Sequence, residues 1–193
     1  MGEEGVGDVV RAAAGGDESS WFALVDRFAS LVWAVTRSFG LESADAADVS
    51  QVTWMRLVEN LERLHEPDRV GAWLVTTARR ECLRVLRQRG RAIPVGDDPS
   101  LDAADLVTLP PVHHLATTER NTLLWRAVSS ISSRCQQLLR VLMADPPPSY
   151  EEVSAALDMP VGSIGPTRAR CLDQLRRVAV QFGITADSLS SVE

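Results

Sequence analysis

Apolar residues recur at intervals of three and four along most of the chain, which is the spacing of one face of an α-helix. In the first half this pattern predicts three helices, over residues 17–39, 43–64 and 68–88. The apolar residues that the second of these would turn inward are Val49, Val52, Leu57, Val58, Leu61 and Leu64. No segment sustains the strict alternation of a half-buried β-strand, so the pattern predicts an all-α fold.

Residues that commonly begin or end a helix stand at the boundaries of these segments. Asp17 and Ser43 can each accept the backbone N–H groups at a helix N-terminus. Gly40 and Gly90 follow the first and third helices, as glycine often does beyond a last helical turn. Pro67 separates the second helix from the third, because proline interrupts a helical pattern.

Helical periodicity resumes in the second half of the chain. It predicts helices over residues 123–131 and 138–142, followed by a stiff break at 146–148, where three prolines stand in a row. Ser149 and Glu152 then match a capping box, in which the two residues satisfy each other's free N–H groups at the start of a helix.

Residues 149–178 predict a helix-turn-helix. A short helix leads through a glycine-containing turn at 158–162 into a second helix, capped by Ser163 and carrying Pro166 in its first turn. In this motif the second helix lies in the major groove of DNA, where side chains near its start read bases and other groups contact phosphates. The outward residues suited to this are Ser163, Thr167, Arg168, Arg170, Arg176 and Arg177. The alternative interpretation is an ordinary helical hairpin with a solvated basic face.

An acidic, proline-containing linker lies between the two helical parts. Its aspartates are Asp97, Asp98, Asp102 and Asp105. The predicted segments are a flexible N-terminus at 1–16, a helical domain at 17–91, the linker at 92–114, a second helical domain at 115–183 and a tail at 184–193. We therefore expect two small all-α domains joined by the linker.

The distribution of charge says more about partners than the total does. The chain of 193 residues has a formal net charge of −6, and all 20 of its basic residues are arginine. Six of these arginines lie within residues 79–91, whereas residues 1–26 and 92–119 are acidic. Separate basic segments allow binding to nucleic acid in spite of the negative total.

Several classes of protein find no support in the sequence. No apolar run approaches the ~20 residues of a membrane span, and the N-terminus lacks the features of a signal peptide, so we expect a soluble, cytoplasmic protein. Cys82, Cys135 and Cys171 are far apart and share no metal-ligand spacing with the histidines, so each is interpreted as a small buried side chain. Without a phosphate-binding glycine loop or a nucleophile motif, we expect no enzyme activity, no metal and no cofactor.

Residues 45–91 carry a resemblance to a known family. The residues that carry it are, in order, Asp48, Gln51, Trp54, Pro67, Trp73, Leu74 and the arginines of residues 76–91. This Asp-x-x-Gln-x-x-Trp pattern, the proline turn, Trp-Leu and the basic helix resemble region 2 of the sigma-70 family, in its extracytoplasmic-function (ECF) subgroup. The linker and the helix-turn-helix follow in the order of that family, so the resemblance covers residues 17–182. It implies a sigma region 2 domain, a sigma region 4 domain, and two partners, core RNA polymerase and promoter DNA.

The resemblance also assigns individual residues to surfaces. Those that would dock on core polymerase are Asp45, Asp48, Gln51, Trp54 and Met55. Those that would bind and melt the promoter −10 element are His65, Arg69, Trp73, Thr76, Thr77, Arg79, Arg80, Arg84 and Arg87. The helix-turn-helix residues would bind the −35 element, and the acidic linker would thread through the polymerase cleft.

Some residues depart from the family pattern. Gly165 and Pro166 stand in the recognition helix where other residues are common, and Arg80 stands where the family often has asparagine, which puts promoter preference in question. Many members are held inactive by an anti-sigma factor, and the sequence leaves open whether this chain has one. Two alternatives also remain open: a helix-turn-helix regulator that never binds polymerase, and a sigma-like decoy that binds polymerase without initiating transcription.

Overall fold

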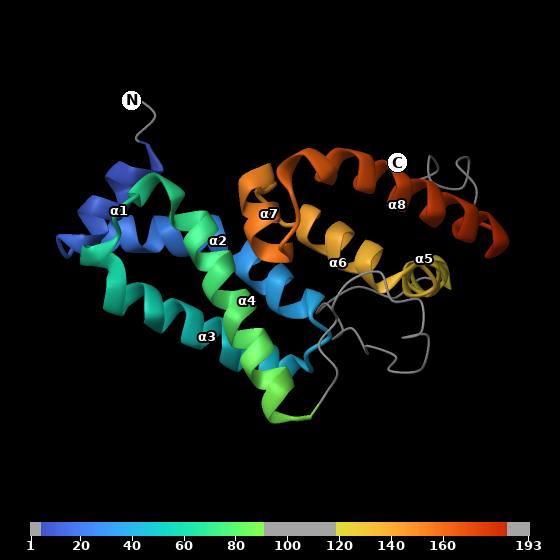
Figure 1. The fold of residues 1–193 in the computed structure, drawn as a ribbon, viewed down its shortest axis with the longest axis horizontal. Coiled ribbons are helices and arrows are strands. Elements are labelled where there is room, and N and C mark those ends of the chain that lie inside the picture. The colour runs from blue at the N-terminus through green and yellow to red at the C-terminus, as the bar shows by residue number, and fades with distance from the viewer. Residues whose placement is uncertain (1–4, 91–118, 185–193) are drawn as a thin grey trace.

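The computed structural model describes residues 5–90 and 119–184, and the regular structure in these two ranges is helical (Figure 1). The first range contains α1 (Val6–Ala14), α2 (Glu18–Ser38), α3 (Ser43–Asn60), the 3-10 turns η1 (Leu61–Arg63) and η2 (Pro67–Arg69), and α4 (Val70–Gln88). The second contains α5 (Glu119–Ser129), α6 (Ser133–Leu142), α7 (Tyr150–Leu157) and α8 (Val161–Gln181). The predicted all-α fold is confirmed.

Two of the predicted helix caps form as expected. The carboxylate of Asp17 accepts a hydrogen bond from the backbone N–H of Ser20 at 2.8 Å, which starts α2. At the start of α7, the N–H of Glu152 donates to Oγ of Ser149 at 3.2 Å, and the N–H of Ser149 donates to Oε2 of Glu152 at 2.7 Å. Ser43, by contrast, is the first residue of α3 and not its cap.

Helix α8 starts earlier than the sequence predicted. The chain reverses quickly after α7, because Asp158 adopts the left-handed conformation with φ of 54°. Pro160 then holds the N-cap position of α8 and Val161 begins the helix, so Ser163 lies inside the first turn and its hydroxyl donates to the Pro160 carbonyl at 2.7 Å. Pro166 consequently lies in the interior of α8, where it has no N–H to donate to the helix.

The N-terminal segment differs from the flexible one that we expected at residues 1–16. Residues Val6–Ala14 form α1, which packs against α2 and η2 and leaves Val10 only 1% exposed. The N–H of Gly7 donates to Oδ1 of Asp68 at 3.0 Å. The valines of this short segment recur at helical spacing, so burial against α2 is the physical reason that it folds.

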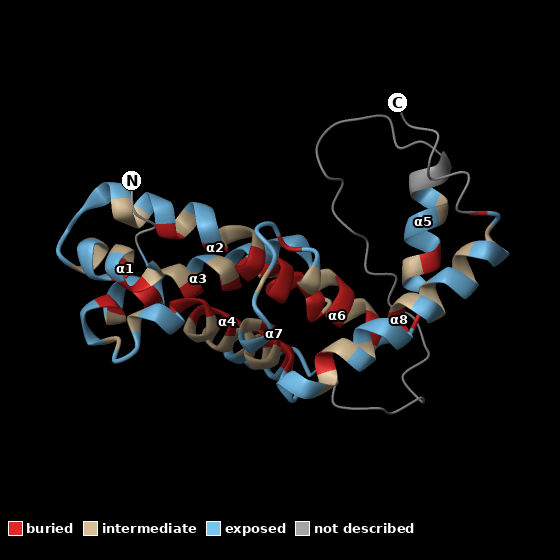
Figure 2. Cartoon of the chain, turned by 90° about the horizontal axis from the view of Figure 1, so that it is seen from above, coloured by how far each residue is buried: buried red, intermediate tan, exposed pale blue. Residues whose placement is uncertain are grey.

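The two halves of the chain pack against each other around one continuous core. Helix α2 contacts α6 and α4 contacts α7, and Figure 2 shows buried residues where these helices meet. The N–H of Asp145 donates to Oγ of Ser30 at 3.1 Å, and Arg140 donates to the carbonyl of Arg37 at 3.4 Å. Burial lowers the pKa of both arginines. Fully buried side chains from both halves include Leu24, Leu57, Leu74, Leu138, Val141 and Ile164.

Two of the three cysteines are joined to each other. Cys135 of α6 and Cys171 of α8 form a disulfide, with 5.2 Å between their Cα atoms. Both are buried, as predicted, but we did not predict the bond from their spacing. Cys82 of α4 is a buried free thiol, and burial raises its pKa to about 12.

Some predictions fall on parts of the chain that the structure does not describe. The linker at 92–114 with its four aspartates, residues 1–4, and all of the predicted tail except Ile184 lie outside the described residues. Within the described ranges, no helix has the length and apolar character needed to cross a membrane.

Candidate functional site

The residues predicted to dock on polymerase lie on α3. Asp48, Gln51 and Met55 are exposed and follow one another at helical spacing on one face. Trp54 is half-buried beside them, with its ring edge-to-face against that of Trp21 in α2 and 6.1 Å between the ring centroids. The structure therefore brings together a carboxylate, an amide and a thioether on an open face, with the tryptophan fixed at its edge.

Val58 extends this face, although we predicted it to point inward. Its side chain is 60% exposed, because the neighbouring Leu57 takes the buried position. The spacing of three residues from Met55 to Val58 is the sequence signal that places both on the outer face. We define the α3 face as Asp48, Gln51, Met55 and Val58.

Asp45 differs from the rest of the predicted polymerase set. Its carboxylate is paired with Arg89, just beyond the end of α4, and its side chain is only 12% exposed. The second carboxylate oxygen, Oδ2, is buried without a hydrogen-bond partner. Asp45 therefore ties α3 to α4 and stands apart from the open α3 face.

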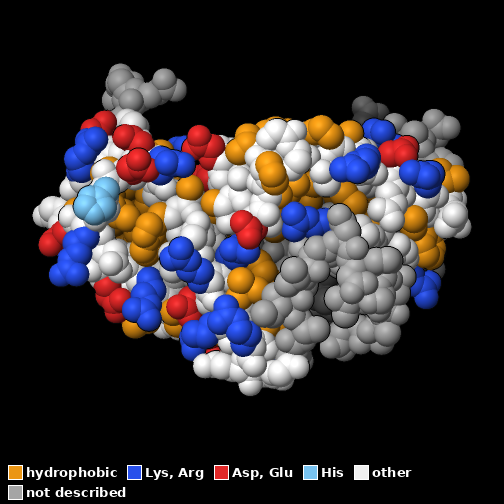
Figure 3. Space-filling view, viewed as in Figure 1, with side chains coloured by type: hydrophobic (Ala, Val, Ile, Leu, Met, Phe, Trp, Pro, Cys, Tyr) orange, Lys and Arg blue, Asp and Glu red, His pale blue; other side chains and the backbone are white. Residues whose placement is uncertain are grey.

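Helix α4 carries a row of exposed arginines. Arg80, Arg84 and Arg87 are spaced by four and three residues, so they share one side of the helix. Arg84 is also paired with Glu81 of the same helix, with 2.6 Å between Nε and Oε2. Figure 3 shows basic side chains gathered over this part of the molecule, with acidic ones between them. Such a row of guanidinium groups can follow the phosphates of a nucleic-acid strand.

The other residues predicted for the −10 element lie nearer the start of α4. His65 and Arg69 are exposed in the segment that precedes the helix. Four others are partly buried: Trp73, Thr76, Thr77 and Arg79. Trp73 packs against the core, so its role is at least partly structural.

Acidic residues of the second half are paired with two of these arginines. Nη2 of Arg79 lies 2.7 Å from Oδ2 of Asp158, and Nε of Arg69 lies 3.7 Å from Oε2 of Glu151. Glu151 belongs to α7 and Asp158 directly follows it. Arg69 and Arg79 are therefore engaged within the protein, whereas Arg80, Arg84 and Arg87 are exposed.

The packing of α7 against α4 is close at Gly71. A Cβ atom added to Gly71 would lie 1.9 Å from Oε1 of Glu152 and 2.8 Å from the ring of Phe28. Figure 1 shows α7 beside α4, and these two helices are in extensive contact. The start of α4 is thus covered by α7, the first helix of the predicted helix-turn-helix.

Helix α8 leaves most of its predicted residues open to solvent. The exposed ones are Arg168, Arg170, Arg176 and Arg177, whereas Ser163 and Thr167 are half-buried. Arg170 donates to Oγ1 of Thr167 at 3.2 Å, and Arg177 is paired with Asp173 at 2.7 Å, both along the helix. Ile164 and Cys171 hold the opposite side of α8 in the core.

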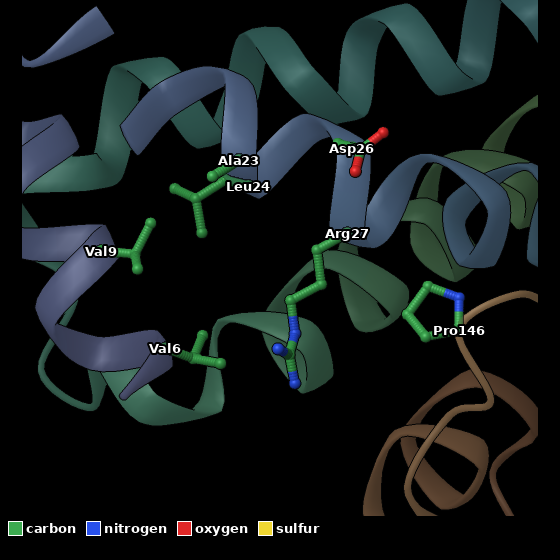
Figure 4. A pocket seen from close by; sticks show the side chains of 7 residues that line it. All are labelled: Val6, Val9, Ala23, Leu24, Asp26, Arg27 and Pro146. Carbon is green, nitrogen blue, oxygen red and sulfur yellow. The ribbon is translucent and has the colours of Figure 1, made fainter. Parts of the chain in front are cut away.

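A hollow of about 290 Å³ lies away from these surfaces, between α1 and α2 (Figure 4). Val6, Val9 and Leu24 line it, and Arg27 and Pro146 lie on its other side. No predicted site residue lines this hollow. In residues 5–90 and 119–184, no group of three or more His, Cys, Asp or Glu side chains could hold a metal ion.

Comparison with known proteins agrees with this geometry. Residues 24–92 match the sigma-70 region 2 family, and this segment holds both the α3 face and the arginines of α4. The structure of CnrH in complex with the cytosolic domain of CnrY is similar, with 19% identity, a TM-score of 0.60, and coverage of 92% of this chain and 99% of that chain.

The sigma factor RpoE, in its complex with the anti-sigma factor NepR from Bartonella quintana, is also similar. It has 21% identity, a TM-score of 0.53, and coverage of 79% of this chain and 93% of that chain. At these identities the likeness shows a shared fold, which extends over both halves of the chain. No curated protein sequence matches the chain.

Proposed function

From the match of residues 24–92 to sigma-70 region 2, we propose that this chain is an initiation factor that binds core RNA polymerase and directs it to promoters with −35 and −10 elements. The resemblance to sigma-70 region 2 that the sequence motifs predicted is confirmed by the match over residues 24–92. The fold shared with RpoE and CnrH agrees with the predicted ECF subgroup. A protein with these partners would act in the cytoplasm and would have no catalytic activity of its own.

The observation that carries the proposal is the open α3 face inside the matched segment. Asp48 and Gln51 offer acceptor groups to a basic helical partner, while Met55 and Val58 offer apolar area that is otherwise exposed to water. Polar groups around exposed apolar side chains are typical of a protein–protein interface. This face is therefore the proposed contact with core polymerase.

Helix α4 is the proposed contact with the −10 element. Arg80, Arg84 and Arg87 would follow the phosphates, and the threonines in the first half of the helix would face the non-template strand of the melted duplex. The loop of residues 65–69 would hold a base flipped out of the duplex, at a cost of a few kcal/mol that contacts in the pocket must offset. Helix α8 is the proposed contact with the −35 element through Ser163, Thr167 and the exposed arginines.

The packing of α7 on α4 implies that polymerase binding precedes full binding of the −10 element. Asp158 pairs with Arg79, and Glu151 lies beside Arg69, whose nearer partner is Glu66 of its own segment, so α7 must leave α4 before the whole −10 surface is available. Binding to polymerase through the α3 face leaves α7 free to move. The isolated protein should consequently bind promoter DNA weakly and in a salt-sensitive way.

A protein inhibitor is proposed as a third partner. The structure of RpoE contains an anti-sigma factor, and a protein of that kind that covered the α3 face of this chain would compete with polymerase. Competition between the two for one surface is the simplest form such regulation could take.

The test is a binding assay between the full chain and core polymerase, with the double variant Asp48→Ala/Gln51→Ala. We expect a loss of affinity of about 10- to 100-fold, because central residues of an interface each contribute about 1–2 kcal/mol or more. Asp26→Ala is the matched control, since it removes an exposed carboxylate from α2, outside the α3 face. Circular dichroism should show that all variants keep their helices.

The same assay separates the alternatives. A helix-turn-helix regulator would not bind core polymerase at all. A decoy would bind it through the α3 face but would yield no transcripts from any promoter. Unchanged affinity in the double variant would contradict the proposed contact.

A further inference from the structure

We propose that Cys135 and Cys171 form a reversible thiol–disulfide site, oxidised by hydroperoxides, that controls how firmly the recognition helix α8 is held. The site and its chemistry stand on the geometry of the second half of the chain. Its consequence for promoter recognition rests on the proposed function.

The two cysteines are far apart in the sequence, and the fold brings them close enough to form a disulfide. They are 36 residues apart, on α6 and α8, yet their Cα atoms are separated by 5.2 Å, within the range that a disulfide spans. Cys135 is 8% exposed and Cys171 is fully buried. The bond joins two helices that are otherwise connected through α7 and its flanking turns.

The bond is located where it can fix the DNA-binding helix. Cys171 lies one residue beyond Arg170 and one helical turn beyond Thr167, on the side of α8 that faces the core. Cys135 lies in the first turn of α6, where its N–H donates to Oγ of Ser132. Movement of α8 away from α6 would therefore displace the residues proposed to read the −35 element.

The first turn of α6 also holds the end of α7. Nη1 of Arg134 donates to the carbonyl of Leu157, the last residue of α7, at 3.2 Å. The neighbouring Cys135 is bonded to α8. Both helices of the helix-turn-helix are thus attached at one point on α6, and the disulfide is the covalent part of that attachment.

Few other contacts hold α8 in place, so the disulfide contributes much to fixing this helix. Along α8 itself, only Ile164 and Cys171 are fully buried, while Leu172, Leu175 and Val178 are partly buried. Pro166 removes one backbone hydrogen bond from the same helix. A cross-link that closes a loop of this length stabilises a small unit more than any one of these contacts does.

The chemistry balances with a hydroperoxide as oxidant. One thiolate attacks the outer oxygen, the O–O bond breaks, and the products are a sulfenic acid and an alcohol, or water from hydrogen peroxide. The second thiol attacks the sulfenic sulfur, the S–S bond forms, and the hydroxyl leaves with the thiol proton as water. A dithiol reductant returns the two electrons by thiol–disulfide exchange.

Burial of the two sulfurs sets the conditions for this reaction. Because Cys171 is fully buried, an oxidant or reductant reaches the pair only when α8 opens locally from α6. Disulfides in cytoplasmic proteins are usually transient, because the compartment is reducing. The reduced state is therefore the resting state, and oxidation locks α8 in place.

The chain supplies its own control cysteine. Cys82 is buried in α4, has no disulfide partner, and has its pKa raised to about 12, so it carries almost no thiolate at neutral pH. The variant Cys82→Ser leaves the site intact, whereas Cys135→Ser removes it. Neither residue belongs to the proposed polymerase or DNA surfaces.

The experiment treats the folded full chain with hydrogen peroxide or a dithiol reductant, stops exchange with acid, then alkylates the free thiols in denaturant near neutral pH and counts them by mass spectrometry. We expect one free thiol after oxidation and three after reduction, interconverting without unfolding. In Cys82→Ser the counts should be none and two. Three free thiols under both conditions, or a bond that is reduced only after denaturation, would overturn the proposal.

A second measurement follows the consequence of the bond. Reduction should lower the melting temperature of the wild-type chain by about 10 °C, given the usual effect of a disulfide on a small domain. It should leave the melting temperature of Cys135→Ser unchanged. An equal shift in both proteins would show that the bond does not hold α8.

A third measurement connects the bond to promoter choice. With core polymerase, the preference for an intact over a scrambled −35 element should fall severalfold on reduction in Cys82→Ser but not in Cys135→Ser. A preference that is identical in both redox states would overturn the control of α8. Absence of transcripts in either state would count against the proposed function, while the thiol counts would still decide the site.

Discussion

The two arginine-bearing helices, α4 and α8, differ in how far the rest of the molecule covers them. Arg69, just before α4, and Arg79, at its middle, are paired with acidic residues in and just after α7. On α8, Arg170 and Arg177 contact Thr167 and Asp173 of the same helix, and Arg168 is exposed. One proposed DNA surface is therefore partly occupied by the protein itself, and the other is open.

Under the proposed function, this difference would let a protein with a net charge of −6 bind DNA only once α4 is exposed. Acidic groups near a phosphate-binding row weaken its attraction for DNA, and separation of the groups restores it. The open surface on α8 is small, so it can contribute preference for a sequence without strong binding. Strong binding would then depend on exposure of α4.

The largest expected effect contrasts one arginine from each helix. Arg168→Ala should reduce the discrimination between correct and altered −35 elements by about 10- to 100-fold, because one good base contact is worth about 1–3 kcal/mol. Arg80→Ala should weaken binding to all sequences about equally, since phosphate contacts do not distinguish bases. Transcription from a panel of altered promoters measures both effects. If both variants changed discrimination and overall binding in the same way, the two helices would not differ in how they contact DNA.

The next prediction tests the close packing of α7 against α4. Gly71→Ala should destabilise the folded chain by about 2 kcal/mol, because the added Cβ meets Glu152 and the ring of Phe28. Gly162→Ala, on α8, is the control: nothing lies within 4 Å of its Cβ position, and alanine favours a helix. Urea unfolding gives both values. No loss of stability in Gly71→Ala would mean that α7 is not closely packed on α4.

A smaller effect concerns the start of α7. Ser149→Ala should cost about 1 kcal/mol, because it removes the side-chain acceptor of the capping box. Ser163→Ala should cost less, because the Ser163 hydroxyl only donates to the Pro160 carbonyl and caps no free N–H group. If urea unfolding showed the reverse order, Ser163 would be the cap that the sequence predicted.

The smallest effect comes from one ion pair. Asp158→Asn should strengthen binding of the isolated chain to single-stranded −10 DNA by about 1.5- to 5-fold, since it frees Arg79 from an ion pair. The effect is small because the Asp158 side chain of that pair is exposed to solvent. Asparagine tolerates the left-handed conformation of this residue, so the turn should remain. Asp173→Asn, which frees Arg177 on α8, should not strengthen that binding, and fluorescence anisotropy can compare the two.

Much of the fold could be predicted because helical periodicity is a local property. The spacing of apolar residues located α2, α3 and α4, and the Asp17 and Ser149 caps were correct because each bonds to groups three residues away. The start of α8 was misplaced, since it depends on how sharply the chain turns at Asp158. Helix α1 was missed because nine residues carry too little pattern to show that α2 would bury them.

The candidate surfaces were less predictable than the helices that carry them. Helical spacing and family motifs located Asp48, Gln51 and the arginines, because these lie on single helices. The pairing of Asp45 with Arg89 and the disulfide between Cys135 and Cys171 join residues that are far apart in sequence. No local pattern predicts such contacts, since they exist only once the helices have packed.

Mapping of transcript starts tests the central claim most directly. Core RNA polymerase would be supplied with genomic template, with and without the purified chain, and the 5′ ends of the transcripts would be sequenced. We predict discrete starts that depend on the chain, preceded by two shared sequence elements at −35 and −10, and lost in Asp48→Ala/Gln51→Ala. Binding to core polymerase without any such starts, or starts that persist without the chain, would contradict the account.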